Sequence, residues 1–295
     1  RQTGAAMLCE SSVQEVMDLS AVAHLATIES RVPFINFLDG FRTSHEYQKI
    51  EVINDEDMRP LINQKALSEF RARALSPEHP VARGMAENPE TFFAHRESCN
   101  PYYDAVPAIV EKYMNELSKI TGREYKLFTY YGAEDADRVI IAMGSVTEAA
   151  REAIDYLNAN GQKVGMVSVH LYRPFSIKHL LAAIPQTAKR IAVLDRTKEP
   201  GADGEPLYLD VRSAFYGTDR NPLIVGGRYG LGSADTTPTM IISVFDTLAL
   251  PQPKDHFTLG IVDDVTFTSL PLEEEKALGG EGIFEAKFYG LGADG

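Results

Sequence analysis

Apolar runs alternate with amphipathic stretches along the chain, and this alternation predicts its secondary structure. Each of the runs is short and is bounded by glycine, proline or polar residues. Runs that are apolar almost throughout are typical of strands covered on both faces of a parallel sheet. The predicted strands are residues 32–40, 138–143, 163–171, 190–195 and 222–229, the last of which leads into a glycine loop.

Helix signals lie between these strands. Ser12 and Glu15 have capping-box spacing, which predicts a mostly buried helix that runs to Ile28. Ser145 and Glu148 repeat that spacing ahead of a second helix. Further helices are predicted at residues 177–184 and 206–217, and after Thr237, where Pro238 takes the first helical position.

This order of elements predicts an α/β fold with parallel sheets in three-layer units. Residues 55–125 are helical in parts but are interrupted by prolines, as expected of connecting helices. We therefore place a domain boundary near residue 125, between a first domain (1–125) and a second (126–295). The stretch from Pro251 onward is expected to be irregular.

Charge and composition narrow the classes of protein. The formal net charge of −13 argues against sequence-independent binding to nucleic acid, and no apolar run reaches the 18 residues of a membrane span. The first ten residues lack the pattern of a signal peptide and a starting Met, so we expect the true start elsewhere. Cys9 and Cys99 are too few for a disulfide framework or for the four thiolates of an iron–sulfur cluster, which favours a cytoplasmic location.

The densest polar cluster is Asp39–Glu46, just beyond a predicted strand, where open α/β sheets bind ligands. Arg42 could hold a carboxylate or phosphate, and His45 could move protons. A structural alternative stays open, because Thr43 and Glu46 also have capping-box spacing and Arg42 could pair with Glu46.

Two other loops follow predicted strands. Residues 226–233 read GGRYGLGS and precede a helix N-terminus, where Arg228 could help to hold an anion. Asp235 stands where a third glycine would be expected, so a packing loop is the alternative. Residues 195–204 carry Arg196 and Lys198, which could bind an anion; a loop whose charges face water is the alternative.

The terminal GLGADG, residues 290–295, has the G-x-G-x-x-G spacing of a dinucleotide site but no helix after it. The sequence holds no phosphate loop of the G-x-x-x-x-G-K type, no zinc-ligand spacing and no G-x-S-x-G. The residues alone therefore indicate an acidic, two-part α/β protein with several anion-loop candidates and no complete active site.

Several long motifs resemble pyruvate:ferredoxin oxidoreductases, and they occur in the order of that family from residue 1 to 295. They are FLDGFRTSHEYQKIEV, LYRPFS, VLDRTKEPGADGEPLYLDV, GGRYGLGSADTTPTM and FYGLGADG. The resemblance implies a longer enzyme that converts pyruvate and coenzyme A to acetyl-CoA and carbon dioxide. It implies thiamine diphosphate, magnesium and [4Fe-4S] clusters as cofactors, and ferredoxin or flavodoxin as the electron acceptor.

The resemblance also assigns the parts of the chain. Residues 1–125 resemble the later part of the pyrimidine-binding domain, and residues 126–295 resemble the transketolase C-terminal domain and end where the next domain begins. The family's catalytic and metal-binding residues match no position here, so the chain alone is expected to be inactive and to bind no cofactor fully. It is expected to assemble with the remaining domains and as a homo-oligomer.

The candidate cofactor-binding residues are Arg42, Thr43, His45, Gly292 and Gly295. Two alternatives stay open: a scaffold that docks other domains, and an isolated nucleotide-binding module. The sequence does not choose between pyruvate and another 2-oxo acid, or between ferredoxin and flavodoxin.

Overall fold

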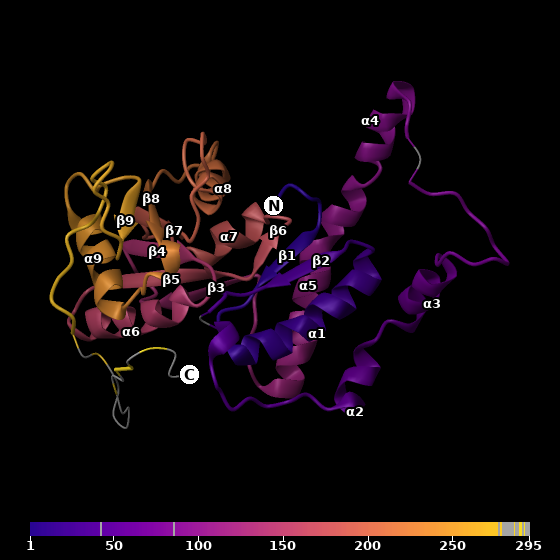
Figure 1. Cartoon of the computed structure of the whole chain (residues 1–295), viewed down its shortest axis with the longest axis horizontal. Coiled ribbons are helices and arrows are strands. Elements are labelled where there is room, and N and C mark those ends of the chain that lie inside the picture. The colour runs from indigo at the N-terminus through magenta and orange to yellow at the C-terminus, as the bar shows by residue number, and fades with distance from the viewer. Residues whose placement is uncertain are drawn as a thin grey trace.

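The computed structural model contains two β-sheets with helices packed around them (Figure 1). It describes residues 1–41, 43–84, 86–276, 278, 286, 289, 290 and 292. One sheet has three strands in the order β2-β1-β6, and the other has six in the order β3-β5-β4-β7-β8-β9. The α/β class with parallel sheets, expected from the alternating pattern, is confirmed.

The smaller sheet is built by the N-terminal part of the chain. Strand β1 (Ala6–Cys9) pairs in parallel with β2 (Phe34–Phe37), and helix α1 (Val13–Ser30) connects them. The prediction of a strand buried on both faces over 32–40 was wrong. The observed strand is shorter, lies at the sheet edge and leaves Ile35 41% exposed.

A long helical connection follows, and only its last helix is firmly packed. Helix α5 (Asn100–Thr121) packs on α1 and buries five side chains: Val106, Val110, Tyr113, Met114 and Leu117. The shorter elements before it have no buried residues apart from Thr43, and α4 projects away from the body of the molecule (Figure 1). They are η1 (Thr43–His45), α2 (Asp55–Met58), η2 (Arg59–Leu61), α3 (Gln64–Ala72) and α4 (Pro89–Glu97).

The larger sheet is parallel except at one edge. Its strands are β3 (Phe128–Gly132), β4 (Arg138–Ala142), β5 (Val164–Val169), β7 (Arg190–Asp195), β8 (Leu223–Tyr229) and β9 (Phe257–Leu259). Only β3 runs antiparallel to its neighbour, β5. Strands β3 and β9 were not predicted. Because β9 lies after Pro251, the prediction that this last stretch is irregular was wrong for those residues.

Helices cover both faces of this sheet. Helices α7 (Ile177–Ala183) and α8 (Pro206–Phe215) lie on one side, and α6 (Val146–Ala159) and α9 (Pro238–Ala249) lie on the other (Figure 1). Thr237 caps α9 as predicted, since its side chain accepts a hydrogen bond from the Met240 N–H. The α7–α8 side shares one apolar core with the smaller sheet, so the core continues across residue 125. The domain division at 125 stays a prediction.

The chain passes from the larger sheet to the smaller one at His170. The predicted single strand over 163–171 was wrong, because β5 ends at Val169 and β6 (Leu171–Arg173) pairs antiparallel with β1. His170 itself is buried, with Nδ1 2.9 Å from the Lys126 carbonyl oxygen and Nε2 3.4 Å from a Glu15 carboxylate oxygen. The break lets one continuous segment tie the two sheets together.

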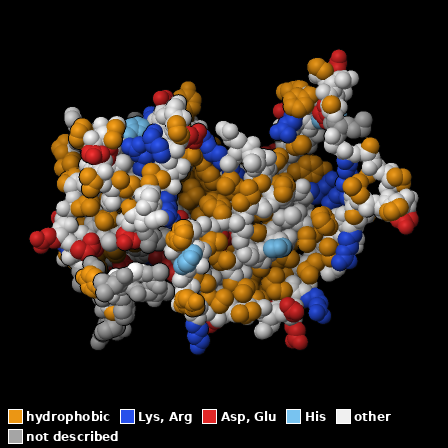
Figure 2. Space-filling model, in the orientation of Figure 1, with side chains coloured by type: hydrophobic (Ala, Val, Ile, Leu, Met, Phe, Trp, Pro, Cys, Tyr) orange, Lys and Arg blue, Asp and Glu red, His pale blue; other side chains and the backbone are white. Residues whose placement is uncertain are grey.

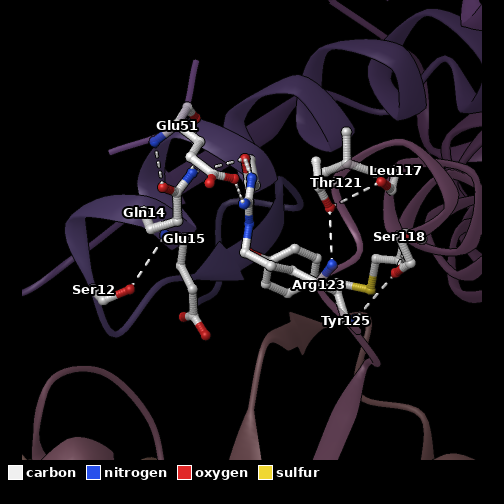
Figure 3. A network of polar contacts seen from close by, with 11 residues as sticks. Ser12, Gln14, Glu15, Glu51, Leu117, Ser118, Thr121, Arg123 and Tyr125 are labelled. Atoms are coloured by element: carbon white, nitrogen blue, oxygen red, sulfur yellow. Dashed lines mark hydrogen bonds and ion pairs between the residues drawn. The ribbon is translucent and has the colours of Figure 1, made fainter. Parts of the chain in front are cut away.

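A buried ion pair fixes α1 to the segment that follows α5. Asp18, with no exposed surface, accepts hydrogen bonds from Arg123 Nε at 2.7 Å and from the Tyr125 hydroxyl at 2.6 Å. Arg123 also donates to the exposed Glu51, whose backbone N–H donates to Gln14 of α1 (Figure 3). A buried carboxylate is tolerated only when paired in this way.

No helix of the described residues is long and apolar enough to cross a membrane.

Candidate functional site

Three loops that the sequence singled out separately meet in the structure. Asp39 follows β2, Arg196 follows β7 and Gly230 follows β8, so all three lie beyond the carboxyl ends of parallel strands. Arg196 Nη1 donates to Asp39 Oδ1 at 2.9 Å, and Arg196 Nε donates to the Gly230 carbonyl oxygen at 3.4 Å. The carboxyl ends of the two sheets therefore face each other across one ion pair, the geometry in which α/β proteins bind ligands.

Asp39 also fixes the start of α6. Its second carboxylate oxygen accepts a hydrogen bond from the Ser145 backbone N–H. The predicted Ser145–Glu148 capping box was wrong, since the Ser145 side chain makes no capping bond and Asp39 satisfies the Ser145 N–H instead. Gly144 makes the approach possible, because it has φ 81° and an added Cβ would lie 2.4 Å from Asp39 Oδ2.

A pocket of about 250 Å³ opens beside this ion pair. Its walls are mainly apolar, and Asp39, Asp195 and Arg196 supply polar groups. Burial raises the pKa of the Asp195 carboxyl to about 6, even though it accepts backbone N–H bonds from Leu207 and Tyr208. The other lining residues are Met7, Cys9, Phe37, Leu38, Met143, Gly144, Tyr172, Leu194, Thr197, Pro206 and Tyr229.

Cys9 and Tyr229 are kept neutral in this pocket. Burial raises the pKa of the Cys9 thiol and of the Tyr229 hydroxyl well above their ordinary values. A thiol attacks or binds a metal as the thiolate, so Cys9 is an unreactive wall residue here. Cys99, also a free thiol, lies elsewhere, between α4 and α5.

A second pocket, of about 340 Å³, is also lined by Arg196. It is bordered by the N-termini of α6 and α9 and by Glu46 and Asp235. Helix N-termini favour anions, but two carboxylates line this pocket and oppose one. The anion-site interpretation of residues 226–233 is therefore not favoured over the packing-loop interpretation.

The glycines of that loop have a packing role. A Cβ on Gly227 would lie 2.2 Å from the Phe257 ring, and one on Gly226 would lie 3.0 Å from the Tyr208 ring. Arg228 donates to the His256 carbonyl oxygen at 3.2 Å, and Lys198 lies 3.9 Å from Glu205. Close packing and local pairing account for these residues.

The residues predicted to bind a cofactor lie apart from the two pockets or outside the described residues. Thr43 is buried, and its hydroxyl donates to the Ser11 carbonyl oxygen at 3.3 Å. Thr43 is the first residue of the 3₁₀ turn η1, and its side chain bonds to Ser11 instead of capping that turn, so the proposed Thr43–Glu46 capping box does not form. His45 is exposed, with Nδ1 2.9 Å from Ser44 Oγ and its ring stacked on Phe41.

Gly292 is exposed, with φ 148°. Arg42 and Gly295 lie outside the described residues. The cofactor-binding role of all five residues stays a prediction.

Two carboxyls with shifted pKa values, the buried Glu10 and the half-buried Glu15, were not predicted as candidate site residues. Burial alone would raise the pKa of Glu15, but hydrogen bonds from His170 and Ser11 outweigh it and lower that pKa to about 2. Glu10 has no exposed surface, and neither of its carboxyl oxygens has a hydrogen-bond partner. Burial and the nearby Glu15 charge raise the pKa of Glu10 to about 9, so it is protonated at neutral pH. The sequence around Glu10 contains no pattern that predicts a buried, protonated carboxyl, because a single acidic residue after a short strand is more often exposed.

Comparison with protein families gives two matches. Residues 1–115 match the model described as pyruvate flavodoxin/ferredoxin oxidoreductase, thiamine diphosphate-binding. Residues 136–241 match the model described as pyruvate:ferredoxin oxidoreductase core domain II.

Curated relatives align along the whole chain. A pyruvate-flavodoxin oxidoreductase of Enterobacter agglomerans is 60% identical over 296 residues, and a pyruvate:ferredoxin oxidoreductase of Moorella thermoacetica is 56% identical over 295. The chain spans about a quarter of the length of these relatives, 25% in both cases. Among solved structures, a 2-oxoglutarate:ferredoxin oxidoreductase from Magnetococcus marinus aligns at 16% identity over 82% of this chain and 42% of that chain, with a TM-score of 0.48.

Proposed function

Because the chain belongs to the pyruvate flavodoxin/ferredoxin oxidoreductase family, we propose that it works as part of a longer enzyme. That enzyme converts pyruvate and coenzyme A to acetyl-CoA and carbon dioxide, and it passes electrons to ferredoxin or flavodoxin. The chain contributes a portion of the thiamine diphosphate-binding domain together with core domain II.

One observation supports a joint role for the two portions. The Asp39–Arg196 pair joins the carboxyl ends of the two sheets and borders the mainly apolar 250 Å³ pocket. Asp39 belongs to the portion that matches the thiamine diphosphate-binding model, and Arg196 belongs to core domain II. In this proposal, core domain II holds the Asp39 loop in place through Arg196 and the Ser145 N–H.

The described residues do not fit the complete thiamine cofactor. A diphosphate with magnesium needs several oxygen ligands, and no group of three or more His, Cys, Asp or Glu within the described part of the chain could hold a metal ion. The apolar pocket suits a ring rather than a diphosphate. Magnesium and the diphosphate are therefore assigned to other parts of the enzyme.

Iron–sulfur clusters do not fit this chain either. A [4Fe-4S] cluster takes four thiolates, whereas the chain has two cysteines, one of which is the buried Cys9. In the proposal, the clusters and the contacts with ferredoxin or flavodoxin lie in the portion of the enzyme outside this sequence.

The proposal is tested by comparing this chain with the full-length enzyme. Pyruvate-dependent reduction of a viologen dye with coenzyme A is expected from the full-length enzyme and not from the 295-residue chain alone. The Asp39→Ala and Arg196→Ala substitutions, placed in the full-length enzyme, are expected to lower the rate by about tenfold or more, since each removes a charge-assisted hydrogen bond. Turnover by the isolated chain, or full activity of both variants, contradicts the proposal.

A ligand titration of the isolated chain provides a second readout. A ligand that binds the native chain and is present at 100 times its dissociation constant stabilises it by about 2.7 kcal/mol. We expect no such shift of the melting temperature with thiamine diphosphate plus magnesium, because the residues that the structure describes hold no group of three or more metal ligands for the diphosphate's magnesium. A clear shift with that mixture would mean that the diphosphate site lies within these residues.

A further inference from the structure

A groove lined by three arginines lies where α3 and the loop after it meet the end of α1. The groove has a volume of about 540 Å³, and Arg31, Arg73 and Arg83 line it together with Thr27, Val32, Pro33 and Phe70. No carboxylate is among the lining residues. Lys and Arg side chains gather in this region of the surface, below the projecting helix α4 (Figure 2). This concentration of positive charge occurs in a chain whose formal net charge is −13.

Two of the three guanidinium groups are held in place by neutral partners, and none of the three is neutralised. Arg31 donates to the Tyr102 hydroxyl at 3.0 Å, and its guanidinium carbon lies 4.9 Å from the centroid of the Tyr102 ring. Arg83 donates to the backbone carbonyl oxygen of Arg73 at 2.5 Å. Within the described residues, no salt bridge joins any of the three to a carboxylate. Each partner is neutral, so all three positive charges remain available.

The backbone at Arg31 is a second unusual feature. Arg31 ends α1 in the left-handed region, with φ 64°, a conformation that glycine adopts without steric cost. The negative end of the α1 dipole favours a cation at this position. Helix α3 also ends at an arginine, Arg73, whose backbone is in the ordinary right-handed region. The helix dipoles explain why a cation lies at the end of each helix. They do not explain why Arg31 and Arg73 line the same groove as Arg83. A non-glycine residue held in the left-handed region costs free energy, and such residues cluster at binding sites and active sites.

We propose that this groove binds a phosphorylated small molecule with an apolar ring. Guanidinium groups pair with phosphate oxygens through two parallel hydrogen bonds, and three of them match a ligand with more than one phosphate. Phe70, Val32 and Pro33 provide an apolar wall for the ring. The volume lies within the range of small-molecule sites, about 300–1,000 Å³. This site is separate from the Asp39–Arg196 junction and does not depend on the proposed enzymatic function.

A small ligand is favoured over an acidic protein segment by the size and shape of the site. The arginines come from three different segments and converge on one groove of about 540 Å³, which is the size of a small-molecule site rather than of an extended peptide surface. The experiment distinguishes these two occupants directly.

The test is isothermal titration calorimetry on the 295-residue chain, with inorganic pyrophosphate, ATP and a hexaglutamate peptide, each at matched ionic strength. ATP is expected to bind more tightly than pyrophosphate, because only ATP has a ring to contact Phe70. Arg73→Gln is expected to weaken ATP binding about tenfold, and Arg73→Gln with Arg83→Gln about a hundredfold. Arg71→Gln is the matched control, since Arg71 is an exposed arginine of α3 that does not line the groove.

Three outcomes overturn the proposal. They are no binding of pyrophosphate or ATP at millimolar concentration, an equal loss with Arg71→Gln and with Arg73→Gln, and tighter binding of hexaglutamate than of ATP. The last result would assign the groove to an acidic protein segment. Circular dichroism of each variant separates loss of binding from loss of fold. Arg31→Gly adds an independent check, because glycine relieves the backbone strain; a folded Arg31→Gly chain with weakened ATP binding supports the assignment.

Discussion

The ion pair between Asp39 and Arg196 is expected to contribute measurably to the stability of the chain, and a double-mutant cycle can measure that contribution. The Asp39 side chain is 14% exposed and that of Arg196 is 23% exposed, and the two charged atoms lie 2.9 Å apart. Two unit charges at that distance attract by about 6 kcal/mol at an effective dielectric constant of 20. Desolvation removes much of this, and a hydrogen bond to a charged group retains about 1.5–3 kcal/mol.

The perturbations are Asp39→Ala, Arg196→Ala and the double substitution. We expect a coupling free energy of about 2 kcal/mol between the two sites, which is a difference of roughly 4 °C in melting temperature for a chain of this size. Asp39→Ala is expected to cost more than Arg196→Ala, because it also leaves the Ser145 N–H without its acceptor. The assay is urea unfolding followed by circular dichroism and by tyrosine fluorescence, since the chain has 13 Tyr and no Trp.

The Asp135–Lys163 ion pair provides the matched control. Its side chains are 55% and 61% exposed, so water screens the two charges and the coupling should be clearly smaller than that between Asp39 and Arg196. If the coupling between Asp39 and Arg196 is no larger than that of the control pair, the ion pair does not join the two sheets and the account of the junction is refuted.

Three further predictions concern stability. Gly144→Ala is expected to destabilise the chain by about 1–2 kcal/mol because of the positive φ at this position, and further because the added methyl group would collide with Asp39. Gly161 has the same φ but open space around it, so Gly144→Ala should lower the melting temperature more than Gly161→Ala does. Equal losses in the two variants would contradict this. Arg123→Ala is expected to cost about 3–5 kcal/mol in urea unfolding, because it leaves the buried Asp18 carboxylate without its ion pair, and a loss below 1 kcal/mol would contradict that role. The pKa of Glu10 is about 9 in the folded chain and 4.5 as its ordinary value, so between these pH values the folded state holds a proton on Glu10 that the unfolded state has lost. The contribution of Glu10 to the stability of the fold therefore falls as the pH rises from 4.5 to 9. Glu10→Gln should flatten the stability profile over that range, and an unchanged profile would contradict the assignment.

Much of the fold could be predicted from local patterns. The apolar runs that form β4, β7 and β8 were placed correctly, since strands covered on both faces must be apolar throughout. Ser12 and Thr237 start their helices as their spacing indicated. Strands β1 and β9 were missed because runs of four and three residues carry too little periodicity to distinguish a strand from a loop. Strand β3 was missed because its sequence, FTYYG, is not a continuous apolar run.

The errors occur where distant parts of the chain decide the outcome. The strand predicted over 163–171 breaks at His170, because its ring is bound between Lys126 and Glu15, which are distant in sequence. Ser145 is satisfied by Asp39, 106 residues away, and a local capping pattern contains no information about such a partner. The strand predicted over 32–40 is partly exposed because the smaller sheet ends at β2.

The sequence by itself determined the α/β class, the alternation of strands and helices, the acidic surface and the family of this protein. These properties follow from residue type and spacing, which act over a few positions. Only the tertiary structure decided that the Asp39 loop meets Arg196, 157 residues later, and that three separate arginines line one groove. The physical reason is that such juxtapositions depend on how the sheets pack and where the chain crosses between them, and these long-range contacts leave no pattern in any short stretch of sequence.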